Sequence, residues 1–319
     1  MARRALAPAT LAVVQAVEAA LDPGDAVLLV ACSGGADSLA LAAGTAHVAR
    51  RSGRAYAAVV VDHGLQEGSA EVAQEAAQAL DGLGFADVAV VRVEVVPDGA
   101  GPEAAARTAR YGALRREATA RRATLLLGHT RDDQAESVLL GLARGSGARS
   151  SSGMAGRSDD LVRPLLGLPR TTTEACCAEL GLRPWHDPQN DDPAYARVRA
   201  RTRVLPVLEA ELGPGVVEAL ARSADLLRAD ADLLDTLADE ARERVGRGDA
   251  LDCAPLAALP DALRTRVLLA WLRDLGAHDL TARHVAAVDA LVVDWRGQGP
   301  LDLPGVRVGR RDGVLRGPT

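Results

Sequence analysis

Residues 33–38 read Ser-Gly-Gly-Ala-Asp-Ser and join an apolar run, residues 26–31, to a helical pattern. A strand that passes into a helix through two glycines is suited to binding phosphate. Glycine lets backbone N–H groups face an anion, and the helix directs its positive dipole end at the same point. We expect the hydroxyls of Ser33 and Ser38 to add donors. Asp37 would repel a bare phosphate, so we interpret it as the ligand of a magnesium ion that accompanies one.

This loop differs from the common lysine-containing nucleotide loop, because no lysine follows the glycines and none occurs anywhere in the 319 residues. It does not match the G-x-G-x-x-G pattern either. The alternative interpretation is a chance Ser/Gly turn between a strand and a helix.

The length and composition favour a two-domain enzyme that contains no disulfide scaffold. A chain of 319 residues can bury two cores. The formal charge of −6 argues against a surface that attracts nucleic acid as a whole, so local clusters would have to do so. Four cysteines include no C-x-x-C pair and no zinc spacing, which fits a reducing cytosol.

The N-terminal stretch could be mistaken for a secretory signal, because residues 11–21 are mostly apolar and follow two arginines. Gln15 and Glu18 interrupt that stretch, and its apolar residues recur at helical spacing. We therefore expect a surface helix. No run reaches transmembrane length, so we expect a cytoplasmic protein without a membrane partner.

From residue 26 onwards, short β-branched runs alternate with longer helical patterns. The predicted strands are residues 26–31, 57–61, 88–95 and 123–127, with helices after each of them. This order predicts an α/β fold with a parallel sheet and helices on both faces. Ligands of such sheets bind at the carboxyl ends of the strands, where three polar motifs stand. These motifs are residues 33–38, 62–64 and 128–129.

The second half predicts a smaller, mainly helical domain. A Gly/Ser-rich stretch, residues 145–156, predicts a mobile segment, and residues 213–215 predict a linker. We therefore divide the chain into a catalytic domain, residues 1–213, and an accessory domain, residues 216–319. The accessory domain is expected to contain helices over 216–245, 255–275 and 281–293 and a hairpin over 301–315.

Two polar pairs have both a functional and a structural interpretation. Asp62 and His63 end the second predicted strand, where they could bind a cation or an amine or form a solvated turn. Arg107 and Arg110 share one helix face, which suits bidentate phosphate contacts but also suits a solvent-exposed face.

The stretch from Gly128 to Glu136 is more specific. Thr130 with Asp133 predicts a helix N-cap and its return partner. His129, Asp132 and Glu136 are not explained by capping, and the two acids lie four residues apart on one helix face. Acidic side chains beside a polyphosphate require a cation, either magnesium or a substrate ammonium.

The strongest basic cluster contains four arginines within seven residues. Such a cluster can neutralise the phosphates of a nucleic acid. It could equally form a solvated helix that pairs with Asp191, Asp192 and Glu209. Its members are Arg197, Arg199, Arg201 and Arg203.

In this order, the motifs closely resemble those of the tRNA(Ile)-lysidine synthetase family, within the PP-loop ATP pyrophosphatases. The resemblance covers most of residues 26–210. In that family ATP adenylates the C2 oxygen of the wobble cytidine of a tRNA(Ile) with a CAU anticodon. The amine of free L-lysine then attacks C2 and expels AMP. The matching stretches are residues 33–38, 61–65, 107–111, 128–137, 144–147, 163–166 and 185–190 with the arginines that follow.

The resemblance implies ATP and Mg²⁺ as cofactors, with the tRNA and free lysine as partners. It implies the nucleotide-binding residues Ser33, Gly34, Gly35, Ala36, Asp37, Ser38 and Arg110, with Asp37 as the metal ligand. It implies the catalytic residues Asp37, Arg107, His129, Asp132 and Glu136. The substrate would contact Asp62, His63 and Asp133, and the tRNA would contact Arg197, Arg199, Arg201 and Arg203.

Two positions depart from the family pattern. Val198 stands where the family usually has asparagine, and Ser137 stands where threonine is common. The alternatives left open are a tRNA thiolase, a small-molecule amide synthetase and a non-catalytic RNA-binding protein. Thiolation needs a sulfur-carrying cysteine, and the pair Cys176-Cys177 lacks the spacing of a cluster site. A homodimer, packed through the accessory domain, is also left open.

Overall fold

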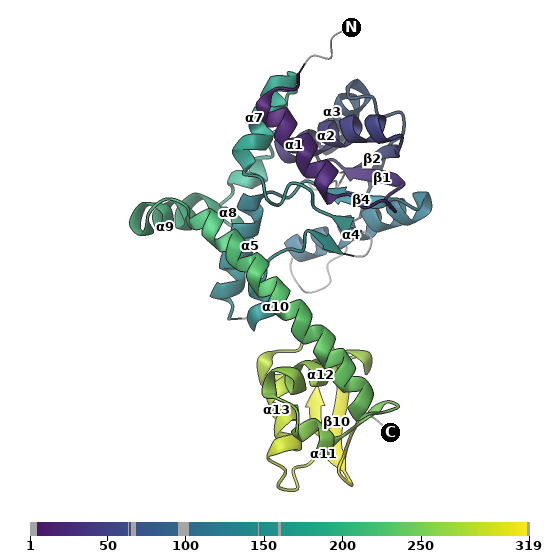
Figure 1. Cartoon of the computed structure of the whole chain (residues 1–319), viewed down its shortest axis with the longest axis vertical. Helices are drawn as coiled ribbons and strands as arrows, with labels where there is room; N and C mark the ends of the chain where they lie inside the picture. Colours follow the sequence, from purple (N-terminus) through teal and green to yellow (C-terminus); the bar gives the residue numbers. More distant parts are fainter. Residues whose placement is uncertain are drawn as a thin grey trace. The chain divides into compact units, whose positions relative to one another are not determined.

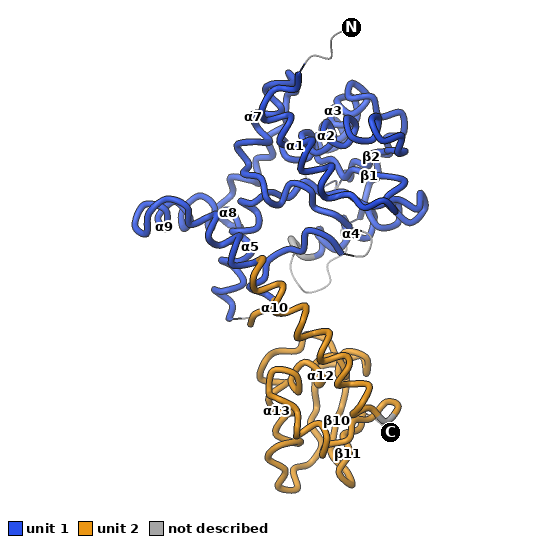
Figure 2. Tube along the Cα trace, in the orientation of Figure 1, with its two compact units in different colours: residues 1–145, 150–224 blue, residues 146–149, 225–319 orange. Residues whose placement is uncertain are grey.

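A computed structural model of the chain describes residues 5–62, 64, 68–94, 102–145, 147–158 and 161–317. The chain forms two compact units, residues 1–145 with 150–224 and residues 146–149 with 225–319 (Figure 2). Among the described helices, none is long and apolar enough to cross a membrane.

The first unit is built on a six-stranded sheet in the order β3-β2-β1-β4-β6-β5. All neighbouring strands pair in parallel except β5 with β6, which confirms the predicted parallel sheet. The two-residue strands β5 and β6 carry too little pattern to be predicted. The strands are β1 (Val27–Ala31), β2 (Ala55–Asp62), β3 (Val88–Arg92), β4 (Thr124–Leu127), β5 (Arg157–Ser158) and β6 (Leu161–Val162).

Helices cover both faces of this sheet, because the strands are apolar on both sides (Figure 1). Leu28 and Val30 of β1 join the core beneath α1, α2, α3 and α7, whereas Leu29 joins the core beneath α4. This alternation follows the two-residue period of a strand. The helices are α1 (Pro8–Ala20), α2 (Ala36–Ser52), α3 (Ser69–Gly82), α4 (Pro102–Arg121), α5 (Arg131–Ala143) and α7 (Arg170–Leu180).

The Gly/Ser-rich stretch contains a short helix, α6 (Gly147–Ser151), where the sequence predicted a mobile segment. The side chain of Gln134 donates to the carbonyl of Met154 and accepts from its N–H, at 3.0 and 2.7 Å. These two bonds hold the segment against α5, so the composition of small residues reflects close packing here.

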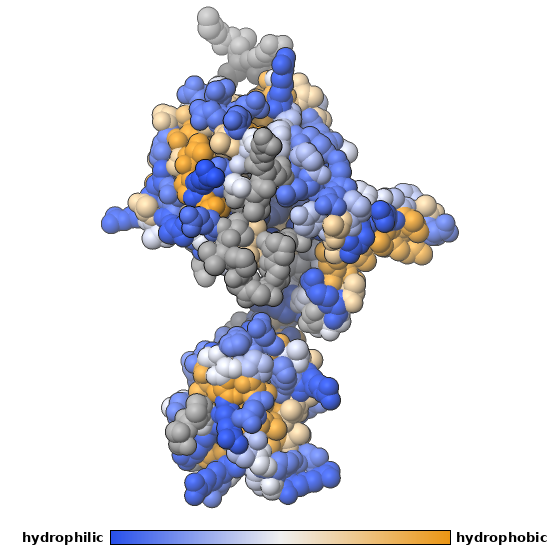
Figure 3. Space-filling view, turned by 180° about the vertical axis from the view of Figure 1, so that it is seen from behind, coloured by the Kyte–Doolittle hydropathy of each residue, from blue (hydrophilic) through white to orange (hydrophobic). Residues whose placement is uncertain are grey.

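The chain then crosses the first unit through short helical pieces. These are η1 (Pro188–Asp191), α8 (Ala196–Arg199), the π-helical turn η2 (Ala200–Val204) and α9 (Leu205–Leu212). An apolar strip lies on the projecting arm at the right of Figure 3, and the exposed side chains in this region are Val204, Val207 and Leu212.

The second unit contains the predicted helices and a sheet that is larger than predicted. The helices are α10 (Val216–Val245), whose residues from 225 onwards belong to this unit, α11 (Cys253–Ala257), α12 (Asp261–Asp274) and α13 (Ala282–Val293). Pro260 ends the pattern that predicted one helix over 255–275. The five strands are antiparallel in the order β7-β8-β11-β10-β9. They are β7 (Gly246–Arg247), β8 (Ala250–Asp252), β9 (Leu301–Leu303), β10 (Val306–Arg311) and β11 (Val314–Arg316).

One glycine sets how closely the central sheet approaches the loop over 33–38. A Cβ added to Gly128, just after β4, would lie 2.9 Å from the carbonyl oxygen of Asp37 and 3.1 Å from the Cα of Ser38. These neighbours are backbone atoms at the start of α2, so they cannot rotate away. The absence of a side chain at Gly128 therefore lets α2 start directly against the end of β4.

We predict that Gly128→Ala lowers the free energy of unfolding by about 1–3 kcal/mol, because α2 must shift to admit the methyl group. Urea denaturation followed by circular dichroism measures this loss. The control is Gly167→Ala, since a Cβ at Gly167 meets no heavy atom within 4 Å. Equal stabilities of the two variants would contradict the close approach.

Candidate active site

The loop after β1 has the conformation that its glycines predicted. Gly34 has a φ of 83°, in the left-handed region that favours glycine. The hydroxyl of Ser38 donates to the carbonyl of Gly35 at 2.9 Å and accepts from the N–H of Ser33 at 3.2 Å. The loop is therefore held by its own hydrogen bonds, and the N-terminus of α2 lies beside it, as an anion site requires.

Asp37, in the first turn of α2, is held by two residues of α7. The Thr173 hydroxyl donates to its Oδ1, and the Arg170 Nε lies 3.3 Å from its Oδ2. Burial raises the pKa of Asp37, assisted by the charge of Asp133 and opposed by Thr173 and Arg170. This acid thus lies where the sequence placed the metal ligand, in a partly desolvated setting.

The donor set around Asp37 fits a magnesium ion that is also held by phosphates. A carboxylate offers about four acceptor positions, and Thr173 and Arg170 take two of them. Magnesium in nucleotide sites is commonly bound by one or two carboxylates plus substrate phosphates and water. Within the described residues, no group of three or more His, Cys, Asp or Glu side chains could hold a metal. Asp37 would therefore share the ion with a bound nucleotide.

The start of α5 confirms the predicted capping pair and gives it a second role. Asp133 accepts hydrogen bonds from the N–H of Thr130 at 2.8 Å and from its hydroxyl at 3.0 Å. Asp133 also binds the Arg170 Nη2 at 2.9 Å. Burial alone would raise its pKa, but Arg170, His129 and the capping bond outweigh burial and lower it. Asp133 is therefore a charged acceptor beside Asp37.

Glu136, one turn further along α5, has a wholly buried side chain. Its Oε1 lies 3.8 Å from the Arg170 Nη1 and its Oε2 lies 3.4 Å from the Arg197 Nε. In the part of the chain that the structure describes, neither oxygen has a hydrogen-bond partner. Burial raises the pKa of Glu136 to about 7, assisted by Asp133 and opposed by Arg170, Arg197 and Arg201. This acid retains unused acceptor capacity.

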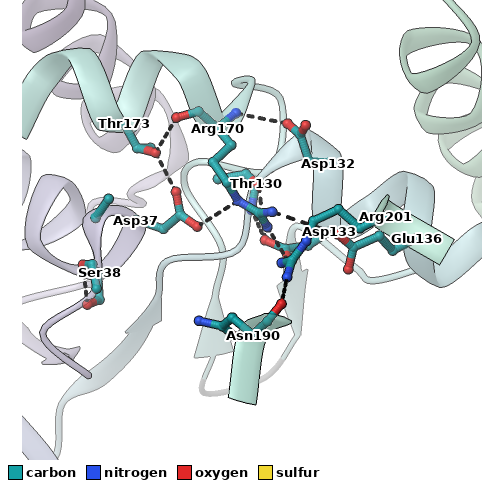
Figure 4. A network of polar contacts seen from close by, with 12 residues as sticks. Asp37, Ser38, Thr130, Asp132, Asp133, Glu136, Arg170, Thr173, Asn190 and Arg201 are labelled. Carbon is teal, nitrogen blue, oxygen red and sulfur yellow. Dashed lines mark hydrogen bonds and ion pairs between the residues drawn. The ribbon is translucent and has the colours of Figure 1, made fainter. Parts of the chain in front are cut away.

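Arg170, which was not among the predicted site residues, joins these acids (Figure 4). Its guanidinium faces Asp37, Asp133 and Glu136, and its backbone N–H donates to the Asp132 Oδ2 at 2.8 Å. The only local signal is its place directly after a proline, at a helix start. In a chain whose basic residues are all arginine, that signal does not single it out.

His129 lies on the basic side of the site. The Arg163 Nε donates to its Nδ1 at 3.2 Å, so the hydrogen bond assigns the ring proton to Nε2. Burial lowers the pKa of His129 to about 3, and Arg163, Arg110 and Arg197 lower it further against the opposing charge of Asp133. At neutral pH this imidazole is uncharged and can donate a hydrogen bond through Nε2.

Arg107 and Arg110 both face Tyr111 on α4. The guanidinium carbons lie 4.9 and 5.6 Å from the centre of the tyrosine ring, within cation–π range. Burial lowers the pKa of Arg110. The expected pairing of two arginines on one helix face is therefore present, with an aromatic side chain beside it.

Asp62 is buried at the end of β2 and accepts the N–H of Gly64 at 2.9 Å. This bond is the contact expected if the residues after β2 form a solvated turn, which is one of the two interpretations of the Asp62-His63 motif. His63 lies outside the described residues.

The four arginines after residue 196 have different partners. Arg197 contacts Glu136 and donates to the Ser137 hydroxyl at 2.8 Å. Arg199 donates to the carbonyls of Pro193 and Ala194, and Arg201 donates to the carbonyl of Asn190. The remaining member, Arg203, is exposed.

The two departures from the family pattern, Val198 and Ser137, both fit their surroundings. Val198 is buried, in keeping with an apolar residue at this position. The Ser137 hydroxyl donates to the carbonyl of Asp133 at 2.8 Å, besides accepting from Arg197.

Two acids that the sequence offered as partners of the four arginines have other partners. Asp191 pairs with His186, and Glu209 accepts the N–H groups of Gly215 and Val217.

Comparison with known proteins identifies both units. A family model described as a PP-loop domain matches residues 10–208, and one described as a TilS substrate binding domain matches residues 251–316. A tRNA(Ile)-lysidine synthase from Thermobifida fusca is 57% identical and covers 92% of both chains. The corresponding protein of Salinispora tropica is 54% identical and covers 98% of this chain and 97% of its own.

A solved structure supports the fold of the first unit. The U34-tRNA thiolase NcsA from Methanococcus maripaludis, with its 4Fe–4S cluster, aligns with a TM-score of 0.57 and 17% identity. The alignment covers 69% of this chain and 80% of the thiolase, and it shows a shared fold only. The family models and the high identities go further, and this chain belongs to the tRNA(Ile)-lysidine synthase family of PP-loop proteins.

Proposed function

We propose that this chain ligates free L-lysine to C2 of the wobble cytidine of a tRNA(Ile) with a CAU anticodon. The product is lysidine, and AMP and pyrophosphate are released. Membership of the family supports the reaction. The geometric observation that carries the proposal is the meeting of Asp37 with Asp133 and Glu136 around one guanidinium. An ATP loop and an amine-binding acid pair are thereby adjacent.

The reaction needs two displacements. In the first, the C2 oxygen of the cytidine attacks the α-phosphorus of ATP, and the bond to the β-phosphate breaks to release pyrophosphate. In the second, the uncharged lysine amine attacks C2, and the C2–O bond breaks with AMP as the leaving group. A bound magnesium ion would neutralise phosphate charge during nucleotide binding. Adenylation turns a poor leaving oxygen into a good one.

Each group of residues takes one part of this chemistry. The loop over 33–38 would bind the pyrophosphate portion, with Asp37 as the magnesium ligand and Arg107 and Arg110 as further phosphate contacts. Asp133 and Glu136 would bind the lysine ammonium, since both are desolvated acids in the same cluster. Neutral His129 would donate a hydrogen bond to the adenylated nucleotide through Nε2.

Asp132, which the resemblance made a candidate partner of the ammonium together with Glu136, also has a structural contact. One of its oxygens accepts the N–H of Arg170, so this acid holds the start of α7. We assign the ammonium chiefly to Glu136, whose two oxygens have no hydrogen-bond partner among the described residues, with Asp133 as the charged acid beside it.

The second unit supports a tRNA substrate, because residues 251–316 match the substrate binding domain of the family. We propose that this unit contacts the tRNA, and that Arg199, Arg201 and Arg203 bind its phosphates. A tRNA-modifying role would place the protein in the cytoplasm. A homodimer stays a prediction that sedimentation equilibrium would test.

The decisive experiment measures pyrophosphate release from ATP and Mg²⁺ with a CAU-anticodon tRNA(Ile), with and without lysine, followed by nucleoside analysis. We expect lysine-dependent conversion of the wobble cytidine to a nucleoside heavier by a lysyl group. ATP turnover that ignores the tRNA would favour a small-molecule synthetase, and sulfur incorporation would favour a thiolase. RNA binding without pyrophosphate release would favour a non-catalytic role.

We predict that Asp37→Asn lowers the rate of pyrophosphate release at least about 10- to 100-fold, the range found when groups that support a metal site are removed. The amide keeps the shape of the side chain but removes the charge that magnesium requires. A malachite-green assay with pyrophosphatase measures the rate. Asp87→Asn, which alters a surface partner of Arg121, is the control. A normal rate of pyrophosphate release in Asp37→Asn would show that Asp37 is not the magnesium ligand.

We predict that kcat/KM for lysine rises as the pH passes through about 7, because ionised Glu136 binds the ammonium and its pKa is raised to about 7. Glu136→Gln should raise the KM for lysine at least about tenfold and flatten this profile. Steady-state assays between pH 6 and 8.5 measure both effects, with Glu117→Gln as the control. An unchanged KM and profile in Glu136→Gln would reject Glu136 as the ammonium partner.

The raised pKa of Glu136 also predicts how the stability of the protein depends on pH, and this prediction does not depend on activity. A folded pKa raised from 4.5 to about 7 means that the folded state binds the extra proton between these values. Stability attributable to Glu136 is therefore lost as the pH rises through this window. Thermal unfolding should show that Glu136→Gln loses less stability than the unaltered protein between pH 5 and 8. A parallel decline in both proteins would contradict the raised pKa.

A further inference from the structure

Arg170 lies at the junction of three helices, and neither displacement of the proposed reaction assigns it a chemical role. Its Nε lies 3.3 Å from an oxygen of Asp37 on α2, and its Nη2 lies 2.9 Å from an oxygen of Asp133 on α5. Its Nη1 lies 3.8 Å from an oxygen of Glu136, also on α5. Each nitrogen of the guanidinium thus faces a different acid, as Figure 4 shows for this cluster.

The backbone at this position makes the same connection. The N–H of Arg170 donates to Asp132 of α5 at 2.8 Å, so an acid of one helix caps the start of another. One turn later, the Thr173 hydroxyl contacts both the carbonyl of Arg170 and Asp37. The start of α7 is therefore fixed to α2 and to α5 by independent contacts.

The position is unfavourable for a cation by local rules. Arg170 is the first residue of α7, where the helix dipole favours negative side chains. It is also mostly buried, with a side chain that is 21% exposed. Only the surrounding acids can compensate for both costs. The presence of Arg170 at this position is therefore best explained by its contacts with those acids.

We propose that Arg170 is a positioning residue that couples the nucleotide half of the site to the amine half. This inference rests on the proposed function, because it takes Asp37 as the acid of the nucleotide·magnesium complex and Asp133 with Glu136 as the acids of the amine. A single rigid guanidinium fixes the relative positions of all three. Binding at either half therefore orders the partner acids of the other half, and such coupling is reciprocal.

The planar fork is essential to this role. An arginine presents five N–H donors in fixed directions, whereas the ammonium of a lysine is a point charge with three donors on one atom. A lysine at position 170 could supply the charge, but it could not hold acids on opposite sides at the same time. Arg170→Lys therefore separates charge compensation from positioning.

The charge balance leaves room for the substrate. The acids Asp37, Asp133 and Glu136 face two guanidiniums, those of Arg170 and Arg197. Both oxygens of Glu136 lack hydrogen-bond partners among the described residues. The cluster can accept a further cation without expelling Arg170, which distinguishes positioning from simple competition for the acids.

The test measures equilibrium binding of radiolabelled L-lysine to the full chain, with and without α,β-methylene-ATP and Mg²⁺. We expect the nucleotide to tighten lysine binding at least about fivefold in the unaltered protein, within the usual range of coupling between sites. Arg170→Met should weaken lysine binding about tenfold or more and reduce the coupling to less than about twofold. Arg170→Lys should regain thermal stability without regaining the coupling.

The matched control is Arg121→Met. Its side chain is 22% exposed and binds two acids, Asp87 and Glu117, so it matches Arg170 in exposed fraction and in having more than one acidic partner. This variant should keep the full coupling. Its thermal unfolding shows how much stability is lost with such a pair of contacts outside the site.

Two results would overturn the proposal. Tighter lysine binding in Arg170→Met would show that the arginine competes with the amine, and unaltered coupling in a folded Arg170→Met would show that it has no positioning role. If that variant does not fold, full coupling in Arg170→Lys rejects the proposal on its own.

Failure of the proposed function gives a different pattern. If the unaltered protein binds α,β-methylene-ATP with Mg²⁺ but no lysine, the amine substrate is wrong. Arg170→Met is then tested by nucleotide affinity, which should fall at least about fivefold because Asp37 loses its support. An unchanged affinity would reject the arginine's role as well.

Discussion

The site depends on the burial of several carboxylates around one guanidinium. Taking charges out of water is costly, and it is compensated only when each charge has close, well-directed partners. Arg170 supplies such partners for Asp37 and Asp133 and an ion pair for Glu136. Without this cation, the start of α2 and the start of α5 would repel each other at the point where the sheet brings them together.

The fold makes that meeting unavoidable. β1 and β4 are neighbours in a parallel sheet, so the helices that follow them, α2 and α5, start at the same edge. Their N-termini carry positive partial charge, which favours the acids of their first turns. Gly128 allows the closest approach of the two connections. The charge pattern of the site therefore follows from strand order and helix direction together.

The site has an acidic side and a basic side. The acids cluster around Arg170, whereas burial, assisted by the charges of Arg163 and Arg110, lowers the pKa of His129 and suppresses its protonation. The proposed reaction binds a polyphosphate and an ammonium, so it needs both kinds of surface close together. A neutral histidine between them can donate a hydrogen bond at a fixed position without adding a charge to either side.

Local patterns in the sequence predicted the local features of this structure. The loop over 33–38 and the pair of Thr130 with Asp133 depend on contacts within six residues, and both have the predicted conformation. Arg170 could not be predicted in the same way, because 133 positions separate it from Asp37. The strands β7 and β8 were missed for another reason: two or three residues carry no readable alternation.

Arg197 shows how composition can mislead. Four arginines in seven residues suited a nucleic-acid surface or, equally, a solvated helix, but Arg197 contacts the buried Glu136. Because every basic residue of this chain is arginine, the sequence does not distinguish a side chain chosen for its geometry from one chosen for its charge. Only the fold shows which acids each arginine meets.

The same contrast between charge and geometry explains how a site that already holds two arginines could bind the amine of the proposed reaction. Arg170 and Arg197 lie 3.8 and 3.4 Å from the oxygens of Glu136, close enough for charge attraction. Neither makes a hydrogen bond there, because each planar fork is directed at other partners: Asp37 and Asp133 for Arg170, and Ser137 for Arg197. A small ammonium with three donors on one atom can supply the missing bonds. The arginines thus meet the electrostatic requirement of Glu136, and under the proposed function the substrate ammonium would meet its hydrogen-bonding requirement.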